Sequence, residues 1–208
     1  EDPIEYHLEG ITQTQTNAEK GYTFSRGLRA ALRQDPDVIM VGEIRDKETA
    51  ATAIHASLTG HFVLSTLHTN NAAGAIPRLI DLGINPKIIA SAVTIAMAQR
   101  LVRKLKKDCA KEVRLQGKHK EIVSKILDSI KDKSKIPKNT ETVWEPVPGG
   151  ACGNGFKGRV GIFEAIFMDE KIEYLTKENP SEREIKKAAQ DQGILTMQQD
   201  GVIKALQG

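Results

Sequence analysis

The 208-residue chain has few aromatic residues and no long apolar run, and each scarcity excludes a class of protein. Aromatic side chains make up 4% of the residues, so few rings are present to stack on the bases of single-stranded nucleic acid. The longest apolar candidate, residues 88–98, is interrupted by Ser91 and Thr94 and is shorter than the roughly 20 residues that span a bilayer. We therefore expect no transmembrane helix in this sequence.

Cysteine and net charge are also sparse. The chain has two cysteines, Cys109 and Cys152, which are far apart in the sequence, and a net charge of only +3. Such a charge allows weak attraction to anionic lipid or nucleic acid and argues for neither. We expect the cysteines to be free thiols in a reducing compartment rather than a disulfide. At 39% apolar and 27% charged residues, the chain can bury one sizeable core and a small appendage.

The most informative stretch, residues 32–70, contains two short apolar segments separated by a helical one. Residues 37–41 form a β-branched run that stops at Glu43, a pattern typical of a buried parallel strand. A second apolar run, residues 62–67, lies between His61 and His68. Because ligands bind where the carboxyl ends of parallel strands meet, we expect Glu43, His68 and the adjacent Thr69 to share one edge.

Glu43 has two interpretations on position alone. In phosphoryl-transfer machinery it would orient or deprotonate the attacking water. Alternatively, it is the half-solvated first residue of a loop and has no chemical role. The strand-end position favours the functional interpretation. Without Glu43 nearby, His61 and His68 would each be interpreted as ordinary core or edge histidines.

Residues 1–104 alternate short apolar strands with helical stretches, which indicates a parallel α/β sheet. Thr23 has the position of an N-cap for a helix that extends to Gln34. One face of this helix carries Arg26, Arg29 and Arg33. These arginines are either a solvated basic stripe or a row presented to a phosphate across a subunit boundary. Arg45, two residues beyond Glu43, is better placed to reach the predicted edge.

Helix signals continue through the rest of the chain. Thr69 or Asn70 can cap a helix that begins near Ala72, and Pro86 opens another whose apolar positions extend to Met97. The lysine-rich residues 105–155 keep a helical period only at Ile122, Val123, Ile126, Leu127 and Ile130. Residues 156–208 are predicted to form a small helical module, with helix starts at Ser181 and near Met197 and a stop at Gly193.

Four motifs in order resemble the ATPases of type II secretion and type IV pilus assembly, a family of hexameric P-loop motors. EDPIEY at residues 1–6 is similar to the Asp box, DPDVIMVGE to the Walker B strand, and TGHFVLSTLHTN to the His box. GRVGIFE at residues 158–164 is similar to the C-terminal subdomain signature. The resemblance covers nearly the whole chain, and several ordered motifs are more specific than one short pattern.

The resemblance implies an α/β fold with an incomplete RecA-like P-loop ATPase core. Residues 1–104 would be the C-terminal part of that core, residues 105–155 a degenerate zinc-type insertion, and residues 156–208 a small helical C-terminal subdomain. Relatives carry two C-x-x-C pairs that hold one zinc ion, whereas this chain retains only Cys109 and Cys152, with Lys106 at one lost position. Even with His119 the chain offers three ligands, and structural zinc takes four. We therefore expect no bound zinc.

The phosphate-binding string G-x-x-x-x-G-K-[ST] does not occur in the sequence. The family places it shortly before the Asp box, in which this chain begins. We expect a C-terminal motor-domain fragment that alone binds ATP poorly and hydrolyses it negligibly. The alternative is a shortened paralogue that does not hydrolyse nucleotide.

By resemblance, the cofactor is ATP with Mg²⁺. Glu43 would be the catalytic base or water-orienting residue, and Glu5 would support the metal and the water. His68 and His61 would sense the γ-phosphate region. Further nucleotide-site candidates are Glu1, Asp2, Arg26, Arg29, Arg33, Arg45 and Thr69.

The same resemblance implies a cytoplasmic homo-hexamer at the inner-membrane face of a secretion or pilus platform. The motor would drive type IV pilus assembly or type II protein secretion. Two alternatives stay open: a non-hydrolysing ring or adaptor subunit, and a nucleic-acid-dependent motor for DNA uptake. The low aromatic content leads us to expect no stable nucleic-acid complex.

Overall fold

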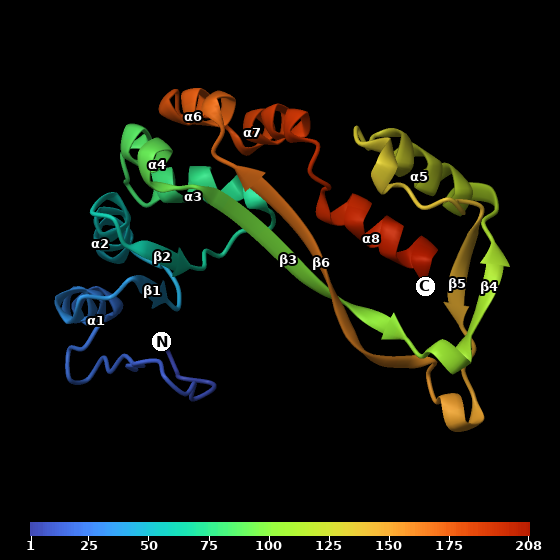
Figure 1. Cartoon of the computed structure of the whole chain (residues 1–208), viewed down its shortest axis with the longest axis horizontal. Helices are drawn as coiled ribbons and strands as arrows, with labels where there is room; N and C mark the ends of the chain where they lie inside the picture. The colour runs from blue at the N-terminus through green and yellow to red at the C-terminus, as the bar shows by residue number, and fades with distance from the viewer. The chain divides into compact units, whose positions relative to one another are not determined.

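The computed structural model describes all residues 1–208, which divide into two compact units (Figure 1). Unit 1 comprises residues 1–94 and 168–185, and unit 2 comprises residues 95–167 and 186–208. Each unit thus contains two separate stretches of chain. The three-segment division predicted from the sequence has other boundaries and stays a prediction. None of the helices has both the length and the hydrophobicity that a membrane crossing requires.

Unit 1 contains a pair of parallel strands. β1 (Val38–Val41) pairs with β2 (Phe62–Ser65), with Val38 opposite Phe62 at one end and Val41 opposite Ser65 at the other. The connection is α2 (Lys47–Leu58), which begins where the Asp46 side chain accepts a hydrogen bond of 2.8 Å from the Thr49 backbone N–H. The predicted strand–helix–strand unit is confirmed.

β1 buries only one of its faces. Ile39 and Val41 are buried, while Val38 and Met40 are exposed. The prediction of a strand buried on both faces is therefore wrong within residues 1–208. The reason is that α1 (Phe24–Ala31) and α2 pack against each other and against β1 and β2, so these two helices cover the buried positions and leave the alternate ones open.

The helical part of unit 1 combines both of its chain stretches. α3 (Ala75–Asp81) and α4 (Pro86–Ala92) precede unit 2, and α6 (Glu170–Lys177) follows it. α4 packs against α6, and Ile89 and Ile172 are almost fully buried. α7 (Glu182–Ala189) begins in the same unit after Ser181, whose side chain and that of Glu184 form reciprocal hydrogen bonds with each other's backbone N–H, as a capping box does.

Two predicted helix boundaries in unit 1 were wrong. The cap before α3 is Asn71, which accepts a 3.0 Å hydrogen bond from the Gly74 N–H, and not Thr69 or Asn70. The turn that it caps is a 3₁₀ turn, Ala72–Gly74. α4 ends at Ala92, so Met97 is not on a helix. Val93 already has an extended backbone, which suits the β-branched residues that follow it.

Unit 2 is built on two antiparallel strand pairs (Figure 1). β3 (Ile95–Leu105) pairs with β6 (Phe156–Phe167), and β4 (Ala110–Arg114) pairs with β5 (Thr142–Pro146). The helices of this unit are α5 (Gly117–Asp128) and α8 (Met197–Gln207). Residues 156–167 were predicted to belong to a helical module, which is wrong. Their aromatic and β-branched residues instead pair along the length of β3.

The apolar core of unit 2 lies between α5, α8 and the segments beside them. Its buried members are Leu115, Leu127, Ile130, Ile203 and Leu206. α8 starts with a capping box, in which the Thr196 and Gln199 side chains bond to each other's backbone N–H. The helical period predicted between Ile122 and Ile130 is confirmed as α5, although that helix ends at Asp128. The helix predicted from near Met197 and the stop at Gly193, which has a left-handed backbone, are also confirmed.

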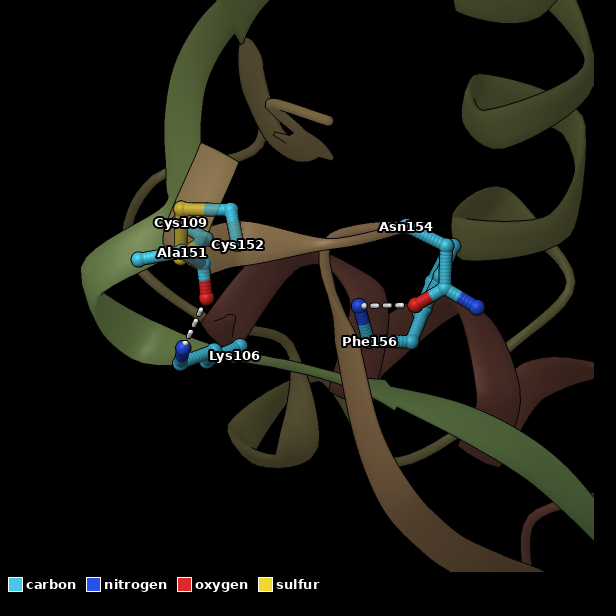
Figure 2. Close-up of a disulfide and its surroundings, with 6 residues drawn as sticks. All are labelled: Lys106, Cys109, Ala151, Cys152, Asn154 and Phe156. Carbon is cyan, nitrogen blue, oxygen red and sulfur yellow. Dashed lines mark hydrogen bonds between the residues drawn. A yellow bond between two sulfur atoms is a disulfide. The ribbon is translucent and has the colours of Figure 1, made fainter. Parts of the chain in front are cut away.

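Cys109 and Cys152 form a disulfide, so the prediction of two free thiols is wrong (Figure 2). The two residues are 43 positions apart in the sequence, but their Cα atoms are 5.6 Å apart. The cause is the β3–β6 pairing, which brings Leu105 opposite Phe156. The turn that follows β3 therefore lies beside the turn that precedes β6. No local sequence pattern reports that pairing.

We predict that Leu127→Ala destabilises the chain by about 2–5 kcal/mol, because the substitution leaves a cavity in the unit 2 core. The measurement is urea unfolding followed by circular dichroism. Ile122→Ala, on the same helix at a side chain that is 42% exposed, is the matched control and should change stability by less than about 1 kcal/mol. Equal losses in the two variants would contradict the assigned helix face.

Candidate functional site

The segments that follow β1 and β2 are joined to each other. The Thr66 hydroxyl donates a 2.7 Å hydrogen bond to the Gly42 carbonyl, and the Ile44 N–H donates to the Thr66 carbonyl at 3.0 Å. The parallel pairing therefore continues beyond the strands. It holds Glu43 and His68 at the same edge, as predicted from the strand ends.

Glu43 is the centre of a small charged cluster. Its Oε2 lies 2.8 Å from Nε2 of His68, and its Oε1 pairs with the Arg45 guanidinium. Arg45 also lies 3.6 Å from the Asp2 carboxylate. The Glu43 side chain is 14% exposed, whereas that of His68 is 79% exposed. The Glu43 carboxylate is thus held by Arg45 and His68, and the His68 imidazole is open to solvent.

The environment of Glu43 favours its ionised form. The hydrogen bond from Arg45 lowers the pKa of the Glu43 carboxyl most strongly, and the His68 hydrogen bond lowers it further. Partial burial opposes both effects by raising that pKa, but the net direction is downward. Glu43 is therefore a carboxylate at neutral pH, which accepts hydrogen bonds and does not donate them.

The predicted Asp-box residues are only partly gathered at this cluster. Asp2 belongs to the cluster through its ion pair with Arg45. Glu1 lies next to Gly42, the residue before Glu43: a Cβ atom added at Gly42 would be 3.4 Å from the Glu1 Cα. The Glu1 carboxylate itself accepts a 2.8 Å hydrogen bond from Gln13. Glu5 is exposed and is not among the hydrogen-bond or ion-pair partners of Glu43.

Two other predicted site residues are placed differently. His61 stands at the opposite end of β2, and its Nδ1 is 3.1 Å from the Ala56 carbonyl. A four-residue strand is roughly 13 Å long, so His61 is not brought together with Glu43 and His68. Thr69 follows His68 directly, and its hydroxyl donates to the Asn71 carbonyl at 3.0 Å.

The three arginines of α1 and its extension lie outside the cluster. Arg29 pairs with Glu48 at 2.9 Å, and Arg26 donates a 3.0 Å hydrogen bond to the Gly21 carbonyl. Arg33 is exposed. Of the four arginines considered from the sequence, Arg45 alone contacts Glu43 in the structure.

One contact close to this edge was missed from the sequence. The Asn71 side-chain amide donates a 2.6 Å hydrogen bond to Glu182, at the start of α7. Both residues belong to unit 1, although 111 positions separate them. Because Asn71 follows His68 by three residues, this bond fixes the loop that carries His68. The capping position of Asn71 was the available signal, but nothing local identifies its distant partner.

Two carboxylates lie at this edge, Asp2 and Glu43, and both are paired with Arg45. The structure has no group of three or more His, Cys, Asp or Glu side chains arranged to hold a metal. Mg²⁺ at nucleotide sites typically takes one or two carboxylates, with phosphate and water oxygens completing its shell. Asp2 and Glu43 offer carboxylate oxygens of that kind.

Comparison with known proteins gives consistent results along the whole chain. The family model "Type II/IV secretion system protein" matches residues 1–208. The chain is 47% identical over 209 residues to "Type II secretion system protein E" of Pseudomonas aeruginosa, and 44% identical over 208 residues to "Type IV pilus assembly ATPase PilB" of the same organism. All of this chain is aligned in both cases.

A solved structure is also similar. It is titled "Crystal Structure of the Pilus Retraction Motor PilT and Bound ADP" and has a TM-score of 0.58 and 27% identity, with 96% of this chain covered. The chain spans 39% and 35% of the lengths of the two Pseudomonas relatives and 50% of the length of the PilT chain.

We predict that Arg45→Gln raises the pKa of the Glu43 carboxyl towards its ordinary value, because the strongest hydrogen bond to the carboxylate is lost. The measurement is a pH titration of the Glu43 side-chain carbon by NMR. Since the folded-state pKa is lowered, this ion pair stabilises the fold above the ordinary glutamate pKa of about 4.3 and the contribution disappears as pH falls through the lowered value.

Arg29→Gln is the control for that titration, since Arg29 pairs with Glu48 and not with Glu43. It should leave the Glu43 curve unchanged. An unshifted curve in Arg45→Gln would show that Arg45 does not hold Glu43 in solution.

Proposed function

Because the chain belongs to the type II/IV secretion system protein family, we propose that it is part of a motor that hydrolyses ATP to drive type II protein secretion or type IV pilus assembly. The names of two relatives with 44–47% identity support this proposal, and one of them is named as an ATPase. The observation that carries it is the Glu43 cluster at the carboxyl edge of β1 and β2. Such an edge is where open α/β sheets bind their ligands.

In the proposed mechanism, Glu43 orients the attacking water. Its carboxylate accepts a hydrogen bond from the water while Arg45 and His68 hold it in one orientation. The lowered pKa of Glu43 makes it a weak base, so positioning the water contributes more than full removal of its proton. Of the two roles predicted from the sequence for Glu43, orienting the water is therefore the one proposed.

His68 is proposed to report the state of the nucleotide. Its imidazole is exposed, and Nε2 already bonds to the water-orienting carboxylate. A change at His68 would pass along two routes: to Glu43 directly, and through the loop to Asn71 and Glu182. The sensing role of His61 stays a prediction, since its ring lies at the other end of β2.

The proposed cofactor is ATP with Mg²⁺. The similar PilT structure was solved with ADP, which supports a nucleotide of this class. The metal would be assisted by Glu43 and by two carboxylates of the Asp box, Asp2 and Glu5. The phosphates would supply its other ligands. Bound Mg²⁺ supplies charge that stabilises the transferred phosphoryl group.

We further propose a homo-hexamer that works in the cytoplasm at the inner-membrane face of a secretion or pilus platform. The support for this proposal is that relatives named for both machineries align with this chain over its whole length. Hydrolysis in a ring of this kind would drive rigid-body movement of domains.

We predict that Glu43→Gln in the full-length protein keeps nucleotide affinity within about threefold but lowers kcat by about 10²–10⁴-fold. The amide retains the shape of the side chain but loses the charge that orients water. Steady-state ATP hydrolysis and equilibrium binding of a fluorescent ADP analogue measure the two effects.

Glu141→Gln is the matched control, because Glu141 is also an acid paired with an arginine but lies in unit 2. Its turnover should equal that of the wild type. Wild-type turnover in Glu43→Gln would refute the assigned role, and wild-type protein that binds ADP without any ATP hydrolysis would indicate a non-hydrolysing subunit.

A further inference from the structure

Two turns in unit 2 face each other across the disulfide (Figure 2). In the first, the Cys109 N–H donates to the Lys106 carbonyl at 2.8 Å. In the second, the Cys152 N–H donates to the Gly149 carbonyl at 2.9 Å. Each cysteine therefore closes its own turn, three residues after the turn begins. The two turns, residues 106–109 and 149–152, together form a compact structure that we call the knuckle.

The donor set at this knuckle does not fit a structural zinc ion. Such an ion takes four nitrogen or sulfur ligands. Here both sulfur atoms are bonded to each other, and no group of three or more metal-capable side chains exists in the structure. His119, the third donor considered from the sequence, is exposed on α5.

Contacts that need no metal connect the two turns instead. The Lys106 ammonium donates a 2.8 Å hydrogen bond to the Ala151 carbonyl (Figure 2). A side chain of the first turn thus provides a hydrogen-bond partner for a backbone carbonyl of the second. Two backbone bonds add to this link: Lys106 N–H to the Gly155 carbonyl at 3.0 Å, and Val147 N–H to the Cys109 carbonyl at 2.8 Å. The covalent link is the disulfide alone.

We propose that the disulfide and Lys106 together cross-link this knuckle in place of a metal, so that its order depends on thiol redox state and not on zinc. Reduction leaves the hydrogen bonds as the only links between the turns. The fold of unit 2 as a whole persists, because its core lies between α5 and α8.

The segment that loosens on reduction is residues 149–155. Four of its seven residues are Gly149, Gly150, Gly153 and Gly155, all with positive φ. Glycine loses more backbone entropy on ordering than any other residue, so this segment gains most when the covalent link breaks. The first turn has less freedom, because only residues 106–109 separate β3 from β4, whereas the longer stretch 147–155 separates β5 from β6.

The reduction is a thiol–disulfide exchange with a dithiol. One thiolate of the dithiol attacks the sulfur of Cys152, because Cys109 is only 4% exposed. The protein S–S bond breaks, and Cys109 leaves as a thiolate. The second thiol of the reductant, as its thiolate, then attacks the mixed disulfide and releases Cys152 as a thiolate. The dithiol is oxidised to its disulfide, and two electrons pass to the protein.

The test compares a chelator with a reductant on the 208-residue chain. Hydrogen exchange of residues 149–155 should rise at least about 10-fold with dithiothreitol and stay unchanged with EDTA. Alkylation followed by mass spectrometry should find no free thiol before reduction and two after it. Elemental analysis should find less than about one-tenth of an equivalent of zinc per chain.

Variants separate the two links. Cys109→Ser with Cys152→Ser should exchange as the reduced wild type does and should ignore dithiothreitol. Lys106→Met should speed exchange further in the reduced state, whereas Lys107→Met, at the exposed neighbouring residue, should not.

Stoichiometric zinc, two free thiols in the untreated chain, or loosening by EDTA would each overturn the proposal. So would unchanged exchange after complete reduction. If the double serine variant does not fold, the reductant and chelator arms on the wild-type chain decide the matter alone.

Discussion

The parallel, in-register pairing of β1 with β2 is the constraint on which the candidate site depends. Because both strands start together and run in one direction, the residues that follow them emerge at one edge. Glu43 and His68 are 25 positions apart in the sequence, yet their side chains touch. A shift of one residue in the register would turn alternate side chains to the other face and would separate this pair.

Much of this edge could be predicted from sequence because its signals are local. A β-branched run, an acid after it and a histidine after the next run identify the ends of two strands, and the fold and family expected from the four motifs are confirmed. Arg45 was also expected near the site, since it is only two residues from Glu43. His61 shows the limit of the family resemblance, because this residue precedes β2 and so lies at the end of the strand away from Glu43.

The features that sequence reasoning missed are produced by distant pairings. The disulfide follows from β3 pairing with β6, and the Asn71–Glu182 bond joins residues 111 positions apart. Periodicity reports which face of a segment is apolar, but not which other segment covers it. The exposed face of β1 has the same origin: the continuous apolar run predicted burial on both faces, and the number of covering layers was not encoded in the run itself.

Unit 1 is interrupted in the chain by residues 95–167, and this matters for synthesis. α4 leaves the ribosome well before α6, against which it packs. At about 5–20 residues per second, the apolar side of α4 waits several seconds for its partner. During that time α4, which carries the fully buried Ile89, can pack only against earlier elements such as α2 and α3. Both units are therefore completed late in synthesis: unit 1 once residues 168–185 have been made, and unit 2 only after that, because α8 supplies Ile203 and Leu206 to its core.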